Sequence, residues 1–423
     1  MPGTELSAWM RRGVLSGMCF LGGLAMTDAR AAAPAPERFE QDRFAISFWV
    51  DPPADREMER RYREIADANF NLVLGGFGAT TSTQIRRQLD LCRKFGMKAL
   101  VPVPGRDLAN LAPDHPALWG YQWLDEPSAS AFPRLAGDVE RVRAARPGKL
   151  LYINLLPGYA PPSALGTATY REHVARFVDE VKPDVLSMDH YPLFDPRGPD
   201  GRDAYCADLE VMRTESLRGG IPFWNFFNTM PYGPHTDPTE AQLRWQVYAS
   251  VAHGAKGVMY FCYFTPGGGE FPKGGAIIAR DGTRTRHYGQ AKRLNAELRA
   301  LGPTLMRLTS TRVVRVKPDS ETTSVLRGGP IRNLAGDPKP DYLVGEFRHA
   351  DGRRGVLLQN YHFAFTAWPT VEFDAPTAAV TEVDKATGKE HAAKDDSPDT
   401  PGMQISLDAG EGRLFMLPAE PRK

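Results

Sequence analysis

The sequence predicts an α/β protein, a (β/α)₈ TIM barrel followed by a small antiparallel β-sandwich. From residue 44 to about 305, short apolar segments alternate with amphipathic helical stretches, as in parallel sheets whose strands are buried on both faces. Eight such strand–helix repeats match the repeat number of this barrel. Beyond residue 311, short alternating segments are separated by turn dipeptides, which is typical of antiparallel strands.

Eight apolar segments are expected to form the barrel strands, because each is short and rich in aromatic and branched side chains. They are Phe44–Val50, Asn71–Gly75, Lys98–Val103, Gly120–Leu124, Leu150–Leu155, Val185–Asp189, Pro222–Phe227 and Gly257–Phe264. The expected helices include Asp55–Ala68, Thr83–Phe95, Phe132–Ala145, Tyr170–Val181, Glu240–His253 and Gly289–Leu301. A doubly wound open sheet is the structural alternative, but no glycine-rich phosphate turn follows the first strand.

The C-terminal part is predicted to contain three antiparallel hairpins. They join Tyr342–Arg348 to Gly355–Tyr361, place Val380–Asp384 before the turn Thr387-Gly388, and join Gln404–Leu407 to Arg413–Leu417. We therefore expect a sandwich domain over residues 309–423, packed against a barrel over residues 32–308. Trp368 is a candidate sugar-binding residue of this second domain.

The N-terminus is predicted to be an export signal. Arg11-Arg12 precede an apolar stretch over Val14–Met26, and Ala29-Arg30-Ala31 offers the small residues that a signal peptidase recognises. The stretch has about 13 residues, fewer than the roughly 20 of a membrane span. The arginine pair resembles a twin-arginine signal, although Met10 stands where Ser or Thr is usual, and an ordinary Sec signal is the alternative. Residues 1–31 are thus expected to be removed from a periplasmic or secreted protein.

The composition indicates a globular protein without a polyanionic partner. The chain is 42% hydrophobic and 24% charged with a net charge of +1, so it has no basic excess for nucleic acid or an acidic membrane. HExxH, P-loop, GxSxG and CxxC patterns are absent. Beyond the signal, Cys92, Cys206 and Cys262 have no metal-like spacing and are expected as buried thiols. We expect no metal and no cofactor, and the oligomeric state stays open.

Polar and aromatic side chains collect at the predicted carboxyl ends of the strands, where reacting groups lie in such barrels. Three carboxylates there are candidates for catalysis: Glu126 after the fourth strand, Asp189 at the end of the sixth, and Glu270 in a glycine-rich loop after the eighth. The candidates for substrate contact are Trp49, Asp51, Trp123, Asp125, Asn154, His190, Tyr191, Asn228 and Tyr263.

This mixture of groups fits the cleavage of a glycosidic bond. One carboxylic acid protonates the leaving oxygen and a second carboxylate attacks or activates water, while aromatic rings stack on the sugar. Glu126, close to two tryptophans in the sequence, is the leading general acid. Asp189 is the leading second carboxylate and Glu270 the alternative. The fourth and sixth strands are not adjacent, which is compatible with the wider spacing of an inverting pair.

Two segments resemble known glycoside hydrolases. Leu124-Asp125-Glu126-Pro127 resembles the end of the fourth strand in the clan A enzymes. Residues 252–261, followed by Gly268-Gly269-Glu270-Phe271, are similar to the eighth strand and its loop in the family 42 β-galactosidases, and the helix over 288–298 fits the same pattern. The resemblance implies a TIM-barrel β-glycosidase with Glu126 as the acid/base residue.

The chain departs from this family at the seventh strand. Clan A enzymes carry a nucleophilic Glu at its end, whereas here Phe227 or Asn228 occupies that place and neither can form a glycosyl ester. Our hypothesis is an exported glycosidase that acts on a carbohydrate substrate. A non-catalytic sugar-binding barrel is the alternative, and a lyase or sugar isomerase would require a His, Tyr or Lys base.

Overall fold

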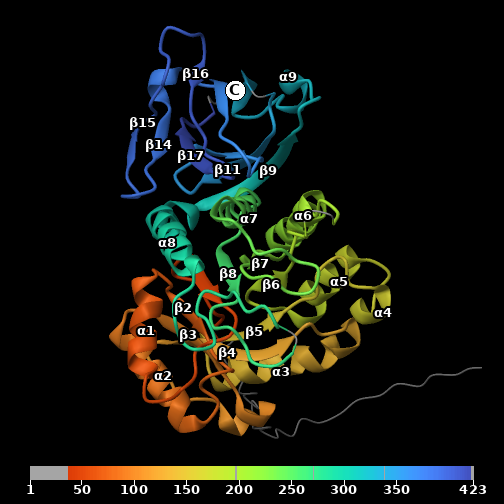
Figure 1. The fold of residues 1–423 in the computed structure, drawn as a ribbon. Helices are drawn as coiled ribbons and strands as arrows, with labels where there is room; N and C mark the ends of the chain where they lie inside the picture. Colours follow the sequence, from red (N-terminus) through yellow and green to blue (C-terminus); the bar gives the residue numbers. More distant parts are fainter. Residues whose placement is uncertain (1–36, 196–197, 270, 338, 421–423) are drawn as a thin grey trace, which may run out of the picture. The chain divides into compact units, whose positions relative to one another are not determined.

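A computed structural model describes residues 37–195, 198–269, 271–337 and 339–420 (Figure 1). The predicted signal peptide and the candidate carboxylate Glu270 lie outside the described residues. Eight parallel strands form two four-stranded sheets, ordered β1-β8-β7-β6 and β2-β3-β4-β5. The strands are β1 (Ala45–Phe48), β2 (Leu72–Leu74), β3 (Lys98–Pro102), β4 (Leu118–Asp125), β5 (Leu150–Asn154), β6 (Leu186–Asp189), β7 (Phe223–Asn228) and β8 (Gly257–Phe261).

Helices alternate with these strands and lie around them in Figure 1. Two of the helices begin with a capping box, in which Thr81 pairs with Gln84 and Thr239 with Gln242, so that each pair satisfies free N–H groups of the first turn. The helices are α1 (Met58–Asp67), α2 (Ser82–Lys94), α3 (Phe132–Ala145), α4 (Pro162–Leu165), α5 (Tyr170–Arg176), α6 (Arg202–Gly219), α7 (Glu240–Ala252) and α8 (Arg286–Leu305), and a π-helical turn, η4 (Phe177–Val181), follows α5.

Two apolar clusters lie on opposite faces of the parallel strands. Along β7, Trp224 and Phe226 belong to an inner cluster with side chains of β2, β3, β4 and β5. Phe227 belongs to the outer cluster, which the strands share with the helices. This alternation is the period of two expected of a strand. Side chains on the inner face at the carboxyl ends of the strands therefore converge on one site.

The two parallel sheets approach each other at both pairs of edges. At one edge the Asn71 N–H, just before β2, donates to the Ile46 carbonyl of β1 at 3.1 Å. At the other edge a parallel bridge joins Leu155, just after β5, to Met188 of β6. Together with the alternating helices, this arrangement is a mixed α/β fold with a TIM-barrel-like core.

Antiparallel strands follow the last helix of this core. They form a six-stranded sheet, β15-β14-β17-β12-β11-β9, and a three-stranded sheet, β10-β13-β16, and apolar side chains from both sheets share one core. The strands are β9 (Leu308–Val316), β10 (Ile331–Asp337), β11 (Tyr342–His349), β12 (Arg354–Asn360), β13 (Trp368–Phe373), β14 (Thr381–Val383), β15 (Glu390–Ala392), β16 (Met403–Gln404) and β17 (Gly412–Leu417), and α9 (Thr322–Val325) lies between β9 and β10.

Two of the three predicted hairpins are confirmed and one is wrong. β11 pairs with β12 and β14 with β15, as the turn dipeptides predict. The segment that begins at Gln404 does not pair with the one that begins at Arg413. β16 pairs instead with β13 in the smaller sheet, and β17 pairs with β12 and β14 in the larger one. The intervening residues thus connect two sheets, which a local turn pattern does not reveal.

The six-stranded sheet packs directly on α7. Gln359 donates from Nε2 to the Trp245 carbonyl at 2.8 Å. At Gly345 of β11, a Cβ atom would lie 2.4 Å from the Ala252 carbonyl oxygen, so this close approach of strand and helix requires glycine. The strands after residue 308 are therefore joined to the core by tight packing. The predicted domain boundary at this position stays a prediction.

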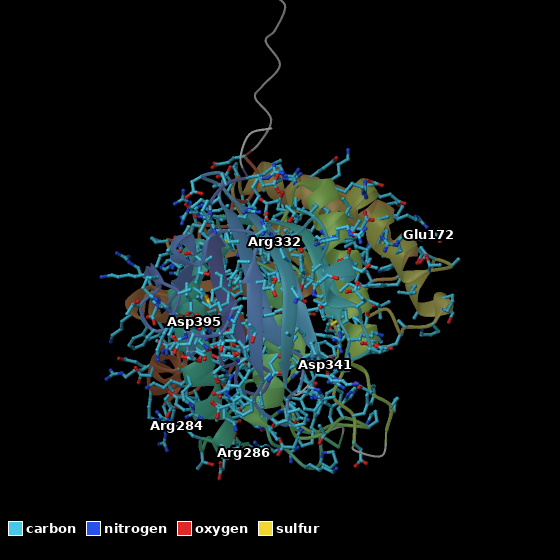
Figure 2. All side chains as sticks on the ribbon, turned by 90° about the horizontal axis from the view of Figure 1, so that it is seen from above. Glu172, Arg284, Arg286, Arg332, Asp341 and Asp395 are labelled. Atoms are coloured by element: carbon cyan, nitrogen blue, oxygen red, sulfur yellow. The ribbon has the colours of Figure 1, made fainter. Side chains whose placement is uncertain are left out.

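The surface of the described residues carries many local ion pairs. Arg284 and Arg286, labelled in Figure 2, lie 3.1 and 2.8 Å from carboxylate oxygens of Glu64 and Asp237. Exposed pairs of this kind contribute little to the free energy of unfolding, so they do not determine the fold. Cys92 and Cys262 are buried and Cys206 is half-buried, all three as free thiols. No helix of the described ranges is long and apolar enough to cross a membrane.

Candidate active site

A small cavity of about 40 Å³ opens at the carboxyl ends of the parallel strands. Six of these strands or their following loops contribute to it, namely β1, β4, β5, β6, β7 and β8. The cavity has roughly the volume of one water molecule, so it marks the floor of a site and does not enclose a sugar ring. Its lining residues are Trp49, Asp125, Asn154, Asp189, Tyr191, Phe226 and Phe261. Five of them, all except the two phenylalanines, are among the residues that the sequence predicts for the site.

Glu126 stands at the exposed rim of this cavity, directly after β4. Its N–H donates to the Asn154 carbonyl at 2.9 Å, which continues the pairing of β4 with β5 by one residue. Its backbone has a φ of 49°, a left-handed conformation that costs a residue with a side chain about 1–3 kcal/mol. The fold therefore holds this carboxyl group in a strained position, as is common at functional sites.

The carboxyl groups of Glu126 and Asp189 interact, and hydrogen bonding to Asp189 lowers the pKa of Glu126. Two carboxyl groups can share such a bond only when one of them carries a proton. Burial raises the pKa of both groups, and the charge of the partner raises that of Asp189 further. Burial also raises the pKa of the neighbouring Asp125. The three groups therefore hold at least one shared proton at a pH where free carboxyls would be ionised.

Asn154 links the two aspartates. Its Nδ2 donates to Oδ1 of Asp125 at 3.2 Å and to Oδ1 of Asp189 at 3.0 Å. Hydrogen bonding by Tyr191 likewise lowers the pKa of Asp189. Hydrogen bonds to an ionised carboxylate favour that form, so these donors oppose the effect of burial on Asp189. Burial still dominates, so the pKa of Asp189 stays well above that of a free carboxyl group, whereas the interaction with Asp189 lowers the pKa of Glu126. The shared proton of the resting pair is therefore expected on Asp189.

Three aromatic side chains near the pair were not predicted from the sequence. Tyr159, after β5, and Phe77, after β2, are 56% and 47% exposed, unusually so for their size. Phe77 packs edge-on against Trp49 with ring centroids 5.1 Å apart. The charges of Asp189 and Glu126 act on the phenols of both Tyr159 and Tyr232. Exposed aromatics in loops at strand ends were the signal that could have found Tyr159 and Phe77.

His190 is part of the wall behind Tyr159 and does not line the cavity. Its Nδ1 lies 2.6 Å from Oδ2 of Asp208 on α6, and the ring is buried. The Tyr159 ring packs edge-on against it at 5.0 Å. The same Asp208 oxygen accepts the Gly158 N–H at 2.7 Å. The pair therefore fixes the loop that carries Tyr159, which is an indirect role for a residue predicted to touch substrate.

Asn228 ends β7, where the resembling family carries its nucleophile. Its side chain is fully buried, and neither amide atom has a hydrogen-bond partner among the described residues. Its backbone N–H and carbonyl are both held by the Gln246 amide of α7 at 3.1 Å. An amide cannot form a glycosyl ester, so any second carboxylate must come from another strand.

Trp123 and Tyr263 are placed on the outer face of the core and not at the cavity. Trp123 donates from Nε1 to Oδ2 of Asp138 on α3 at 2.9 Å. Tyr263 is buried and stacks on Phe48 at 4.5 Å. Both belong to the apolar cluster between strands and helices. Their geometry supports a packing role in each case.

Asp51 is buried beneath the loop that follows β2. Its Oδ1 accepts the N–H groups of Phe77 and Gly78, and its Oδ2 accepts those of Ala79 and the Gln88 side chain, at 2.8 to 3.2 Å. Burial raises the pKa of Asp51 to about 6, against the opposite effect of these backbone hydrogen bonds. The carboxylate therefore anchors the loop that carries the exposed Phe77 ring.

Replacing Asp51 with alanine is expected to lower the free energy of unfolding by about 2–4 kcal/mol, because four donors lose their acceptor, two of them in buried hydrogen bonds. Chemical denaturation at neutral pH measures this. The same substitution at Asp107, an exposed residue that accepts one N–H from Ala109, should cost about 1 kcal/mol. Equal small losses for both variants would contradict the anchoring role.

Comparison with known proteins shows that the chain has a glycoside-hydrolase-like α/β fold. The model of the glycoside hydrolase family 42 β-galactosidases matches residues 158–301, a segment that contains Asp189 but not Glu126. The resemblance to this family seen in the sequence is thereby confirmed. No curated protein matches the chain.

Solved β-galactosidases share the fold at low sequence identity. The enzyme of Bacillus circulans sp. alkalophilus has a TM-score of 0.59 and 11% identity, covering 90% of this chain and 100% of its own. A catalytic mutant of the family 42 enzyme of G. stearothermophilus has a TM-score of 0.53 and 10% identity, with the same coverage. The match to the enzyme of the psychrophilic Marinomonas ef1 has a TM-score of 0.45 and 14% identity, and it covers 61% of this chain and 60% of that enzyme's chain. The first two matches show a common fold, and their low identities leave the activity open.

Within the described ranges, no group of three or more His, Cys, Asp or Glu side chains is placed to hold a metal ion. The cavity and its rim offer carboxyl groups, phenols and one amide. Such groups transfer protons and hold hydroxyl groups.

Proposed function

We propose that this chain is an exported glycoside hydrolase in which Glu126 is the general acid and Asp189 the second carboxylate. The observation that carries the proposal is the meeting of acids at the ends of β4 and β6, where Asn154 donates to both Asp125 and Asp189 and the charges of Glu126 and Asp189 act on each other. The proposal requires the shared proton to pass to Glu126 when a substrate binds. A protonated carboxyl group beside an ionised one supplies both halves of glycoside cleavage, the proton for the leaving oxygen and the attacking or water-activating base.

The surroundings of the pair fit a sugar bound over the cavity. Glu126 is exposed, so it can reach a glycosidic oxygen. Phe77 and Tyr159 offer exposed rings from two loops, and sugar rings stack on aromatic faces. Asp189 lies at the floor, 9% exposed. The carboxyl groups must separate when a substrate enters, because catalytic pairs are about 5 Å or more apart in both retaining and inverting enzymes.

The proposal includes a closed (β/α)₈ barrel. It is supported by the Asn71–Ile46 hydrogen bond at one edge of the two sheets and the Leu155–Met188 bridge at the other. Closure would bring the ends of β4 and β6 to one rim, as the carboxyl pair requires. Export is supported by the predicted signal segment at the N-terminus.

A non-catalytic sugar-binding protein is the second candidate. It is favoured by Asn228, which stands where the resembling family has its nucleophile. The two candidates differ in turnover and not in binding. An enzyme must lose activity when Glu126 is replaced by a residue that cannot donate a proton, whereas a binding protein shows no hydrolysis with or without Glu126.

The full chain should be incubated with a panel of aryl β-glycosides and short oligosaccharides, and the released sugar measured. Hydrolysis of at least one substrate, abolished in the Glu126→Gln variant, is the expected result. Binding of a sugar by calorimetry without hydrolysis of any member of the panel would instead favour the non-catalytic candidate.

A further inference from the structure

We infer that Ser187 and Tyr152 are positioning residues that orient the Asn154 amide toward the carboxylates of Asp125 and Asp189. Neither was singled out from the sequence, and neither lines the cavity. The inference rests on the proposed function, because it assigns these residues a part in setting the proton position of the same carboxyl pair.

A continuous chain of hydrogen bonds runs through the inside of the parallel strands to the site. The Tyr152 hydroxyl and Ser187 Oγ lie 2.8 Å apart, and Ser187 Oγ donates to Asn154 Oδ1 at 2.9 Å. Asn154 Nδ2 then reaches Asp125 and Asp189. Tyr152, Ser187 and Asn154 are 2%, 0% and 3% exposed, so no solvent competes for these bonds.

The number of hydroxyl hydrogens determines which group donates in each of these hydrogen bonds. A serine hydroxyl has one hydrogen, and that of Ser187 is used on the Asn154 carbonyl oxygen. The Tyr152 hydroxyl must then be the donor to Ser187 at 2.8 Å, a stronger acceptor than the other one in its reach, Met259 Sδ at 3.4 Å. Every hydrogen bond therefore points toward the carboxylates, and successive bonds in such a chain polarise one another.

Ser187 determines which end of the Asn154 amide faces the acids. An amide can turn over and exchange its oxygen with its nitrogen. With Ser187 donating to Oδ1, only the NH₂ group is left for Asp125 and Asp189. Without that donor, the amide can present its oxygen to a carboxylate, which is repulsive. The serine thus holds the hydrogen bonds that favour the ionised form of Asp189, which is the form that the proposed mechanism requires.

Other titratable groups also face the carboxyl pair and must be considered in a pH experiment. They are Asp125 from β4, Tyr159 after β5, Tyr170 from α5, Tyr191 after β6, Tyr232 after β7, and the pair of His190, just after β6, with Asp208 of α6. Among the described residues, none of these groups is hydrogen-bonded to the Ser187 hydroxyl, whose partners are Tyr152 and Asn154. A Ser187 substitution therefore changes the amide donor and leaves these groups in place.

The test is the Ser187→Ala variant of the full chain. Loss of the donors destabilises the ionised form of the pair, so the acid limb of the kcat/KM–pH profile should move to higher pH by about 0.5–1 unit. Ser187→Thr keeps a hydroxyl and should restore most of the wild-type profile. Tyr152→Phe should shift the limb in the same direction by less, and it serves as a second variant if Ser187→Ala folds poorly.

Ser47→Ala is the matched control. Ser47 is also fully buried within a parallel strand, and its hydroxyl has no hydrogen-bond partner among the described residues. Its removal should leave the acid limb unchanged. A Ser187→Ala profile within about 0.2 unit of wild type, or an equal shift in Ser47→Ala, would overturn the inference.

A readout without turnover separates this inference from the proposed function. The carboxyl groups of the resting protein can be titrated by infrared difference spectroscopy, with Glu126→Gln and Asp189→Asn variants to assign the bands. If the wild type hydrolyses no glycoside but the titration moves in Ser187→Ala, the positioning role stands and the hydrolase proposal falls. If hydrolysis is found but neither profile nor titration moves, the positioning role is wrong and the hydrolase proposal is unaffected.

Discussion

Replacing Glu126 with glutamine is expected to lower kcat for glycoside hydrolysis by about 10²–10⁴-fold, because the variant cannot protonate the leaving oxygen. The change is nearly isosteric and the side chain is exposed, so the fold should be retained. KM should change far less than kcat, since the proton is needed in the transition state and not for binding. Steady-state kinetics on the best substrate of the panel measures both constants.

Glu140→Gln is a suitable control for this prediction. Glu140 is exposed on α3, away from the strand ends, and the substitution makes the same chemical change. Its kcat should equal that of the wild type within experimental error. A Glu126→Gln enzyme within a few-fold of the wild type would remove Glu126 from the mechanism.

Replacing Asp189 with asparagine is expected to lower kcat by on the order of 10³-fold, because the site then lacks its attacking or water-activating carboxylate. The loss should not add to that of Glu126. Residues that act as one unit are strongly non-additive, so the double variant should be about as slow as the slower single variant. Multiplied losses would instead indicate two independent groups.

Asp184→Asn is the matched control for Asp189. Asp184 lies just before β6, at the opposite end of the same strand, and is also buried. It accepts hydrogen bonds from Arg38 and Arg143 at 2.7 and 2.9 Å. The control variant should lose stability but keep kcat. An equal loss of kcat in both variants would show that a buried charge in β6 is needed for folding and not for chemistry.

The sequence predicts the order of the strands and helices well because a strand buried on both faces is a nearly continuous apolar run. All eight strands of the core overlap the expected segments, and α3 has the expected bounds, Phe132–Ala145. Pairing between segments far apart in the chain is less predictable. The third hairpin is wrong because β16 joins a different sheet from β17, and that choice depends on the shared apolar core.

The site is predicted only in part, because strand position does not give the direction of a side chain. Trp123 and Asp125 are two residues apart and would share a face of a regular strand. The register of β4 against β5 shifts between Gln122 and Leu124. Trp123 therefore faces α3 whereas Asp125 lines the cavity. A bulge of this kind leaves no clear pattern in one sequence.

The hydrogen bonds that lead from Tyr152 through Ser187 to Asn154 could not be predicted from the sequence either. Ser187 and Tyr152 are common residues in strands, and nothing in their spacing marks them as partners. Their contact arises from the stagger between β5 and β6, where Leu155 lies opposite Met188. Asp51 and His190 are predicted from their place at strand ends, yet each makes buried hydrogen bonds that fix a loop. Burial, which a single sequence does not give, decides between the two roles.

The dependence of hydrolysis on the leaving group tests the central claim, that Glu126 supplies the proton in a carboxyl pair with Asp189. A dinitrophenyl glycoside needs no protonation, whereas a methyl or phenyl glycoside does. We predict that Glu126→Gln lowers kcat/KM by less than about 10-fold for the dinitrophenyl glycoside and by about 10²–10⁴-fold for the others. Asp189→Asn should be slow on both kinds of substrate. Equal losses of Glu126→Gln on both kinds, or no loss on either, would contradict the account.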